Sequence, residues 1–316
     1  MAKYAAFGFT IESGIELPEL VTATGSDAPD WRIRIARGER PGAPGIPVGS
    51  DVVSGDVRVR AYASEATLRV VFDDTGAFDV HPGHREIVWY PGPCPTEAAI
   101  RADLLGRVMA LAAHADGHLT LHASAVSIFG RAVAIVGAKH AGKSTVALAL
   151  VRQGARLLAD DTVVVRIHGG SAWAAPGVQG IRLWEDAARA LGAVVSRPRE
   201  AKPVAVLAPS EVETAPMPLA ACYLLESSPD LNSADVRRAQ LSPVHAALGC
   251  VRFSKLGALA GGSAGVAVLD RAAALTKRVP LFVATVRRDL SRLGAVAEQL
   301  MAWHDPARVH DPAVAR

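Results

Sequence analysis

Long apolar runs, cysteine pairs and lysine are all scarce in this chain of 316 residues. No run of 18 apolar residues occurs, and the N-terminal MAKYAAFGFTIESG lacks the basic region, apolar stretch and cleavage site of a signal peptide. We therefore expect neither a membrane span nor export. The three cysteines stand far apart without a C-x-x-C spacing, which excludes a zinc knuckle and a disulfide framework and favours a reducing, cytoplasmic location.

A concentrated positive charge is also absent. The 34 basic residues face 31 acidic ones, a net charge of +3, and only six of the basic residues are lysine. This balance excludes a dedicated nucleic-acid binder. Hydrophobic residues make up 50% of the chain and charged residues 21%, so a largely disordered chain is excluded too. At about 150 residues per domain, the length suggests two domains.

The first part of the chain, residues 1–95, is predicted to be a small β-rich N-terminal domain. Runs of β-branched and aromatic residues, separated by Gly, Pro and Asp, predict strands at 31–35, 57–62, 67–72 and 85–90. Recurrent Pro and Gly predict a loop over residues 37–51. The segment PGPCP at 91–95 ends the pattern and marks the expected domain boundary.

The second part, residues 96–316, has mixed helical and strand patterns that predict an α/β catalytic domain. Thr96 is the expected N-cap of a helix that runs to Gly117. Two strands at 119–129 and 131–137 should form a hairpin around Gly130, and Gly154 should end the helix that follows them. The other expected elements are a strand at 155–167, a helix at 181–191, strands at 203–207 and 221–225, a helix at 265–276, a strand at 279–286 and an amphipathic helix at 289–303.

A phosphate-binding loop is the strongest motif. GAKHAGKS at 137–144 satisfies G-x-x-x-x-G-K-[ST], with an apolar strand before it and an apolar helix behind it. Its backbone amides can cradle phosphate oxygens at a helix N-terminus. Lys143 is expected to reach the β and γ phosphates of ATP, and Ser144 to ligate magnesium. The expected nucleotide-binding residues are Gly137, Ala138, Lys139, His140, Ala141, Gly142, Lys143, Ser144 and Thr145.

Two further elements lie around this loop. Asp160 and Asp161 follow the apolar run LLA, 17 residues after Lys143, with one helix and one returning strand between. Adjacent carboxylates repel each other unless a cation or proton lies between them, so metal binding is their natural use. His122 precedes the loop strand among small and apolar neighbours, and in isolation a strand histidine of this kind is more often a core residue than a functional one.

Together His122, the phosphate loop and the ADD pair resemble the catalytic core of the HPr kinase/phosphorylase family, over about residues 117–192. The resemblance implies an α/β P-loop kinase core of the HPr kinase/PEP carboxykinase-like type. It is thin elsewhere, although the β-rich front segment and LWEDAARALG are similar to HPr kinase-related proteins found beside peptide-modification genes, including lasso peptide kinases. His140 stands where the family usually has glycine, and a negative φ would accommodate its side chain.

The resemblance also implies site roles. Asp160 would accept the proton of the acceptor hydroxyl, His122 would orient Asp160 or tune its pKa, and Asp161 would bind magnesium with Ser144. This division between the two aspartates could be reversed. Arg182 could fold over the transferring phosphoryl group or form a structural salt bridge. The E-x-R-G-L-G segment of true HPr kinases is absent, and PGVQGIRLWEDA stands in its place, which favours an acceptor other than HPr.

The expected activity is transfer of the γ-phosphoryl group of ATP, with Mg²⁺, to a serine of a peptide or protein, the leading acceptor being a lasso-type precursor peptide. Kinase action on a small hydroxyl compound, an HPr-type kinase/phosphorylase and a non-catalytic ATP-responsive module are the alternatives. Arg287 and Arg288 could serve an acidic peptide or cap a sheet edge. The apolar face of the helix at 289–303 could pack internally or between subunits of a homo-oligomer.

Overall fold

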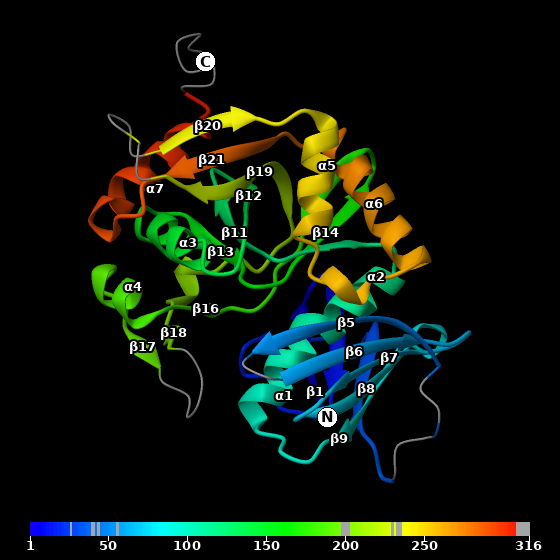
Figure 1. Ribbon diagram of the computed structural model, residues 1–316. Helices are drawn as coiled ribbons and strands as arrows, with labels where there is room; N and C mark the ends of the chain where they lie inside the picture. The colour runs from blue at the N-terminus through cyan, green and yellow to red at the C-terminus, as the bar shows by residue number, and fades with distance from the viewer. Residues whose placement is uncertain are drawn as a thin grey trace. The chain divides into compact units, whose positions relative to one another are not determined.

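The structure, a computed structural model, describes residues 1–25, 27–38, 42, 45–54, 57–196, 203–228, 231 and 236–307 (Figure 1). Internal contacts divide the chain into two units. The first unit comprises Met1–Thr120 and Ser254–Arg271, and the second comprises Leu121–Phe253 and Ala272–Arg316. This boundary lies beyond the one expected after residue 95, and each unit is described by itself.

The first unit is built on one twisted, mostly antiparallel sheet. Its strand order is β3-β1-β2-β4-β9-β8-β7-β6-β5, in which β2, β4 and β9 pair in parallel. Strands were predicted at four of these positions, and all four are present as β4, β6, β7 and β9. The strands are β1 Ala2–Ala6, β2 Phe9–Ser13, β3 Val21–Thr22, β4 Trp31–Ile35, β5 Ile46–Ser54, β6 Val57–Ala63, β7 Leu68–Phe72, β8 Gly76–His81 and β9 Glu86–Pro91.

Strand β5 corrects the loop expected over residues 37–51. It pairs with β6 despite Pro47 and Gly49, and it lies at the edge of the sheet, where a proline without an N–H costs little. Register shifts occur between Pro47 and Gly49. A Cβ built on Gly49 would lie 2.0 Å from the carbonyl oxygen of Ala258, so glycine permits this close approach of two backbones. That approach explains why residues 254–271 belong to the first unit.

The helical segment after residue 95 also belongs to the first unit. Its helices α1 (Glu97–Asp103) and α2 (Met109–Ala115) are joined by a π turn, and the Thr96 hydroxyl accepts from the Ala99 amide as predicted. The apolar residues of its inner face are buried. Polar contacts tie the segment to the sheet, since Thr75 Oγ1 donates to Asp103 at 2.6 Å. Residues 96–120 therefore pack with the front sheet, which sequence periodicity alone does not reveal.

The second unit has a mixed α/β sheet. Its order runs β14-β15-β19-β12-β11-β13, and β21 pairs with β19 and with β20. The predicted hairpin around Gly130 is present as β11 and β12. Beyond β10 (Leu119–Leu121), which spans the boundary, the strands are β11 Ala123–Ile128, β12 Arg131–Val136, β13 Arg156–Ala159, β14 Val163–His168, β15 Ser171–Ala174, β16 Ile181–Arg182, β17 Val195–Ser196, β18 Val204–Ala205, β19 Met217–Ser227, β20 Val236–Gln240 and β21 Leu281–Val286.

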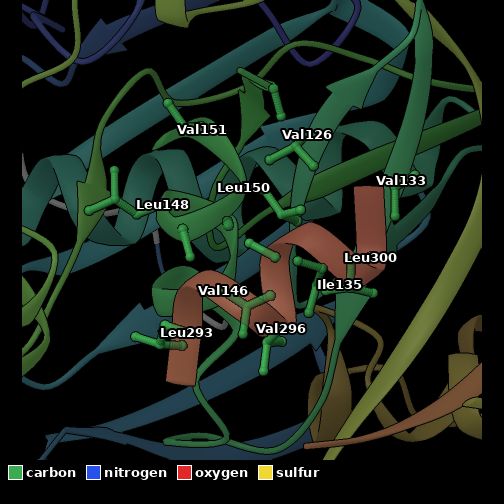
Figure 2. Close-up of a cluster of buried hydrophobic side chains, with 14 of the residues drawn as sticks. Val126, Val133, Ile135, Val146, Leu148, Leu150, Val151, Leu293, Val296 and Leu300 are labelled. Atoms are coloured by element: carbon green, nitrogen blue, oxygen red, sulfur yellow. The ribbon is translucent and has the colours of Figure 1, made fainter. Parts of the chain in front are cut away.

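Helices α3 and α7 pack on one face of this sheet. Figure 2 shows Val146 and Leu150 of α3 beside Val296 and Leu300 of α7, with strand residues such as Ile135 around them. The apolar face of α7 is therefore buried within its own unit, which settles one alternative left open by the sequence. The helices are α3 Lys143–Arg152, α4 Glu185–Ala190, α5 Pro243–Arg252, α6 Ser263–Thr276, which crosses the boundary, and α7 Leu293–Ala302.

Two expected elements are shorter than predicted. Only Glu185–Ala190 of the segment 181–191 is helical, because Ile181 and Arg182 pair with β18 in a small sheet of order β16-β18-β17. The C-terminal helix begins at Leu293, after a 3₁₀ turn that Asp289 caps. Within the described part of the chain, no helix is both long enough and apolar enough to cross a membrane. The expected frayed tail at 304–316 falls mostly outside the described residues.

Candidate functional site

The phosphate loop joins strand β12 to helix α3, as the motif predicts. Gly142 adopts φ +95° as the residue that precedes α3, and its carbonyl accepts from the Val146 amide at 2.9 Å. The Lys143 side chain is 7% exposed and folds back over the loop, where its ammonium donates to the carbonyls of Gly137 and Ala138, each at 3.0 Å. A cation and a helix N-terminus thus converge where phosphate oxygens can bind.

His140 adopts a left-handed conformation, with φ +67°. The negative φ that would accommodate its side chain is therefore not adopted, and the loop holds a residue with a Cβ in the region that favours glycine. The Ala141 amide donates to the Ala138 carbonyl at 3.1 Å, which closes a four-residue turn with His140 at its third position. A type II turn needs a positive φ at that position, which is why glycine is common there. The imidazole lies beside Trp184, with ring centroids 5.4 Å apart.

The strain at His140 can be measured with a pair of variants. Both His140→Gly and His140→Ala remove the ring contact with Trp184, and only alanine retains a Cβ in the left-handed region. We expect the glycine variant to be more stable than the alanine variant by about 1 kcal/mol. Chemical denaturation of the two variants provides the comparison. Equal stabilities would contradict a left-handed residue 140.

Asp160 is the buried centre of the site and is 3% exposed. Its Oδ1 accepts from Ser124 Oγ at 2.6 Å and from Ser144 Oγ at 2.9 Å, and its Oδ2 accepts from the Arg182 amide at 3.3 Å. Burial raises the pKa of the Asp160 carboxyl, Asp161 raises it further, and the hydrogen bonds oppose the rise. A loop hydroxyl and a carboxylate this close form the oxygen pair that P-loop enzymes use toward magnesium.

Asp161 and His122 form a second, more accessible pair. His122 Nδ1 lies 3.2 Å from Asp161 Oδ1 and 3.2 Å from the Asp161 carbonyl oxygen. The two side chains are 31% and 39% exposed, respectively. Asp161 adopts φ +68°, and the Thr162 amide donates to the Asp160 carbonyl at 2.8 Å. This tight turn breaks the single strand predicted over 155–167 into β13 and β14.

Strand directions explain why these groups meet. Strand β11 runs antiparallel to both β12 and β13, so β12 and β13 point the same way. The phosphate loop leaves the end of β12, and the acidic pair leaves the end of β13, at the same edge of the sheet. In sheets of this kind, ligands bind outside the carboxyl ends of the strands.

The arrangement brings together most of the residues expected in the site. His122, Lys143, Ser144 and both aspartates converge, whereas Arg182 reaches Asp160 through its backbone amide. Within the described residues, no carboxylate forms a salt bridge with the Arg182 guanidinium. Ser124 was missed. It lies two residues after His122, so the alternation of side chains along a strand was the signal available for it.

Known proteins are similar to this chain over the segment that carries the phosphate loop. Residues 114–177 match the family model described as "HPr Serine kinase C-terminal domain". The HPr kinase/phosphorylase of Chlorobium phaeobacteroides is 46% identical over 56 residues, which are 18% of this chain and 16% of that protein. The HPr kinase/phosphorylase of Chloroherpeton thalassium is 43% identical over 61 residues, 19% of this chain and 18% of that protein.

The match is local, since the chain spans less than a fifth of the length of these curated relatives. Among solved structures, the Hpr(Ser) kinase/phosphatase of Coxiella burnetii is 15% identical with a TM-score of 0.30, covering 58% of this chain and 95% of that one. The family resemblance predicted from His122, the loop and the ADD pair is confirmed by the matched segment. In its phosphate loop and the strands around it, the chain is similar to the HPr kinase family.

Proposed function

We propose that this chain is an ATP-dependent kinase that transfers the γ-phosphoryl group to a serine hydroxyl of a peptide or protein. The observation that carries the proposal is a pair of carboxylates in different environments beside a phosphate loop. Asp160 is buried against Ser144, and Asp161 is exposed against His122. Similarity to the HPr serine kinase domain over residues 114–177 supports serine as the acceptor.

Ser144 and Asp160 are suited to hold a magnesium ion with ATP. Their oxygens lie 2.9 Å apart at the start of α3. Magnesium in kinases is held by one or two protein oxygens together with substrate phosphates. No group of three or more His, Cys, Asp or Glu able to hold a metal occurs among the described residues, which agrees with a site that substrate completes. When bound, the ion would neutralise charge on the β and γ phosphates.

Asp161 is the better candidate for the base, and we assign the two aspartates in the order opposite to that implied by the family resemblance. Asp160 accepts hydrogen bonds from two serine hydroxyls, so its oxygens are occupied on the protein side. Asp161 is 39% exposed and can reach an incoming hydroxyl. His122 holds its carboxylate within 3.2 Å and acts as a positioning residue.

The transfer then requires little covalent participation by the protein. The serine oxygen bonds to the γ-phosphorus, the bond from that phosphorus to the β–γ bridging oxygen breaks, and ADP leaves with the electron pair. The hydroxyl proton moves to the Asp161 carboxylate. Lys143 and the loop amides hold the phosphates, and the Arg182 guanidinium is available to the transferring group. Such positioning and charge neutralisation account for most phosphoryl-transfer catalysis.

The acceptor we propose is a ribosomally made precursor peptide of the lasso type, in a cytoplasmic setting. The support is the resemblance of the front segment and of LWEDAARALG to kinases of that kind, together with the absence of the HPr-recognition segment. Although Trp184 of that segment lies beside His140 of the phosphate loop, neither feature supplies a phosphate-binding group. The acceptor can therefore be tested separately from the kinase chemistry.

Incubation of the protein with Mg·ATP and a serine-containing precursor peptide from the gene's neighbourhood tests this function. We expect the peptide mass to increase by one phosphate group. Lys143→Ala should abolish the increase, because the loop loses its cation, whereas Lys277→Ala, an exposed lysine in the turn after α6, should retain it. An unmodified peptide with intact ATP hydrolysis would refute the acceptor, and transfer by Lys143→Ala would refute the site.

A further inference from the structure

A pocket of about 680 Å³ lies at the ends of strands β19 and β21. It is lined by Ser227, Ser228, Arg287, Arg288, Asp289 and Leu290. The two serines end strand β19 or follow it, and the other four residues follow strand β21. None of these residues belongs to the phosphate loop, the acidic pair or the His122 contact.

The pocket opens at the same edge and on the same face of the sheet as the phosphate loop. Strand β19 is parallel to β12, and β21 is parallel to β19, so all three strands end at one edge. A Cβ built on Gly137 would lie 3.1 Å from the Leu225 carbonyl oxygen, which places Leu225 under the loop. Ser227 is two residues further, about 7 Å along the strand and on the same face as Leu225.

The pocket and the acidic pair flank the phosphate loop from opposite sides. The sheet runs β21-β19-β12-β11-β13, with the loop after β12, the acidic pair after β13 and the pocket after β19 and β21. A triphosphate on the loop that directs its γ-phosphate toward Asp160 and Asp161 must extend its other end away from them. That direction leads over strand β19 toward the pocket.

The chemistry of the lining suits a nucleoside. Among the described residues, the buried Nε of Arg287 has no hydrogen-bond partner, whereas its Nη2 donates to the Leu231 carbonyl. The Leu231 contact holds Arg287 in the wall of the pocket, with its Nε beneath the surface that a ligand would touch. Guanidinium planes such as that of Arg288 stack on bases, and Leu290 adds an apolar surface.

Asp289 adds an acceptor for sugar hydroxyls. Its Oδ1 accepts from the Ser291 amide at 2.9 Å and from Ser291 Oγ at 2.7 Å. These hydrogen bonds hold the pKa of Asp289 below its ordinary value, so the group is ionised at neutral pH. Both bonds use Oδ1, which leaves the acceptor capacity of Oδ2. Acidic residues in nucleotide sites commonly bind ribose hydroxyls in this way.

We propose that the pocket formed by Ser227, Ser228 and residues 287–290 binds the base and ribose of the ATP whose phosphates occupy the phosphate loop. The inference rests on the proposed kinase function and deepens it. It assigns Arg287 and Arg288 to the nucleoside, in place of an acidic peptide or a sheet edge. It also assigns opposite sides of the loop to the nucleoside and to the acceptor serine.

Calorimetric titration with two ligands, Mg·ATP and Mg·tripolyphosphate, tests the proposal, since only ATP carries a base and a ribose. Arg288→Ala removes the stacking surface, and Ser227→Trp places a bulky ring in the pocket. We expect each variant to weaken ATP binding by about tenfold and to leave tripolyphosphate binding within about twofold of the unmodified protein. Arg131→Ala and Ser171→Trp, exposed positions at the start of β12 and of β15, are the matched controls and should change neither affinity.

Other results would separate the two proposals. Equal weakening of ATP and tripolyphosphate by Arg288→Ala would place the pocket residues on the phosphates and overturn the nucleoside assignment. Unchanged ATP binding in both pocket variants would overturn it as well. Lys143→Ala should weaken the binding of both Mg·ATP and Mg·tripolyphosphate. If the affinity for neither ligand falls, the phosphate site of the proposed kinase function is wrong, whatever the pocket variants do.

Discussion

Asp161→Asn is expected to lower kcat for serine phosphorylation by about 10²- to 10⁴-fold and to leave the Kd for Mg·ATP within about threefold. The amide has nearly the shape of the carboxylate but cannot accept the hydroxyl proton. Asp161 lies beside His122 and away from the Ser144–Asp160 contact, so the nucleotide site should remain intact. Single-turnover kinetics and calorimetric titration of Mg·ATP measure the two quantities separately.

The matched control is Glu298→Gln, an exposed carboxylate on α7, which should leave kcat unchanged. His122→Asn should lower kcat less than Asp161→Asn does, because a positioning residue acts through the base. The opposite result would restore the assignment implied by the family resemblance. In that case Asp161→Asn would keep full activity, and Asp160→Asn would lose transfer but still bind ATP in a magnesium-dependent way.

Local sequence patterns predicted the phosphate loop and the elements around it, because each motif lies within a few consecutive residues. The loop motif was flanked by its own strand and helix, and Gly154 adopts the left-handed conformation expected after the helix, with φ +97°. The approach of the acidic pair to the loop could be anticipated since one helix and one strand return the chain there, although the family resemblance paired Ser144 with Asp161 and the contact is with Asp160. Thr96 likewise caps its helix as predicted.

The missed features depend on neighbours that are distant in sequence. Gly49 is tolerated in a strand because Ala258, more than two hundred residues later, approaches its backbone closely. The two aspartates differ in burial because Ser124 and the Arg182 amide surround only Asp160. His140 takes a positive φ where its residue type argued for a negative one, since the turn geometry of the loop overrides side-chain preference.

The burial of Asp160 makes stability depend on pH in a direction that Asp160→Asn should remove. Burial raises the pKa of Asp160 above its ordinary value of 3.8, so the folded protein binds this proton more tightly than the unfolded chain. The contribution to the free energy of unfolding is therefore fully present below pH 3.8 and is lost as pH rises through the folded pKa. Asparagine does not titrate, so the wild type should lose stability relative to the variant as pH rises above 3.8 and through the folded pKa of Asp160.

Mg·ATP should oppose this difference at neutral pH. A cation shared with Ser144 favours the ionised Asp160, so ligand should stabilise the wild type, by about 2.7 kcal/mol at one hundred times its Kd. Asp160→Asn, with affinity lowered at least tenfold, should gain about 1.4 kcal/mol less. Thermal unfolding at several pH values, with and without Mg·ATP, measures both effects.

A control at another buried aspartate makes the outcome decisive. Asp79→Asn would break a buried ion pair with Arg69 in the first unit, so it tests whether any buried aspartate produces the same ligand response. It should lower stability without changing the gain from Mg·ATP. An equal gain for the wild type and Asp160→Asn would contradict a magnesium role for Asp160. The magnesium role would then pass to Asp161, the other carboxylate of the acidic pair, so the same titration would decide between the two assignments.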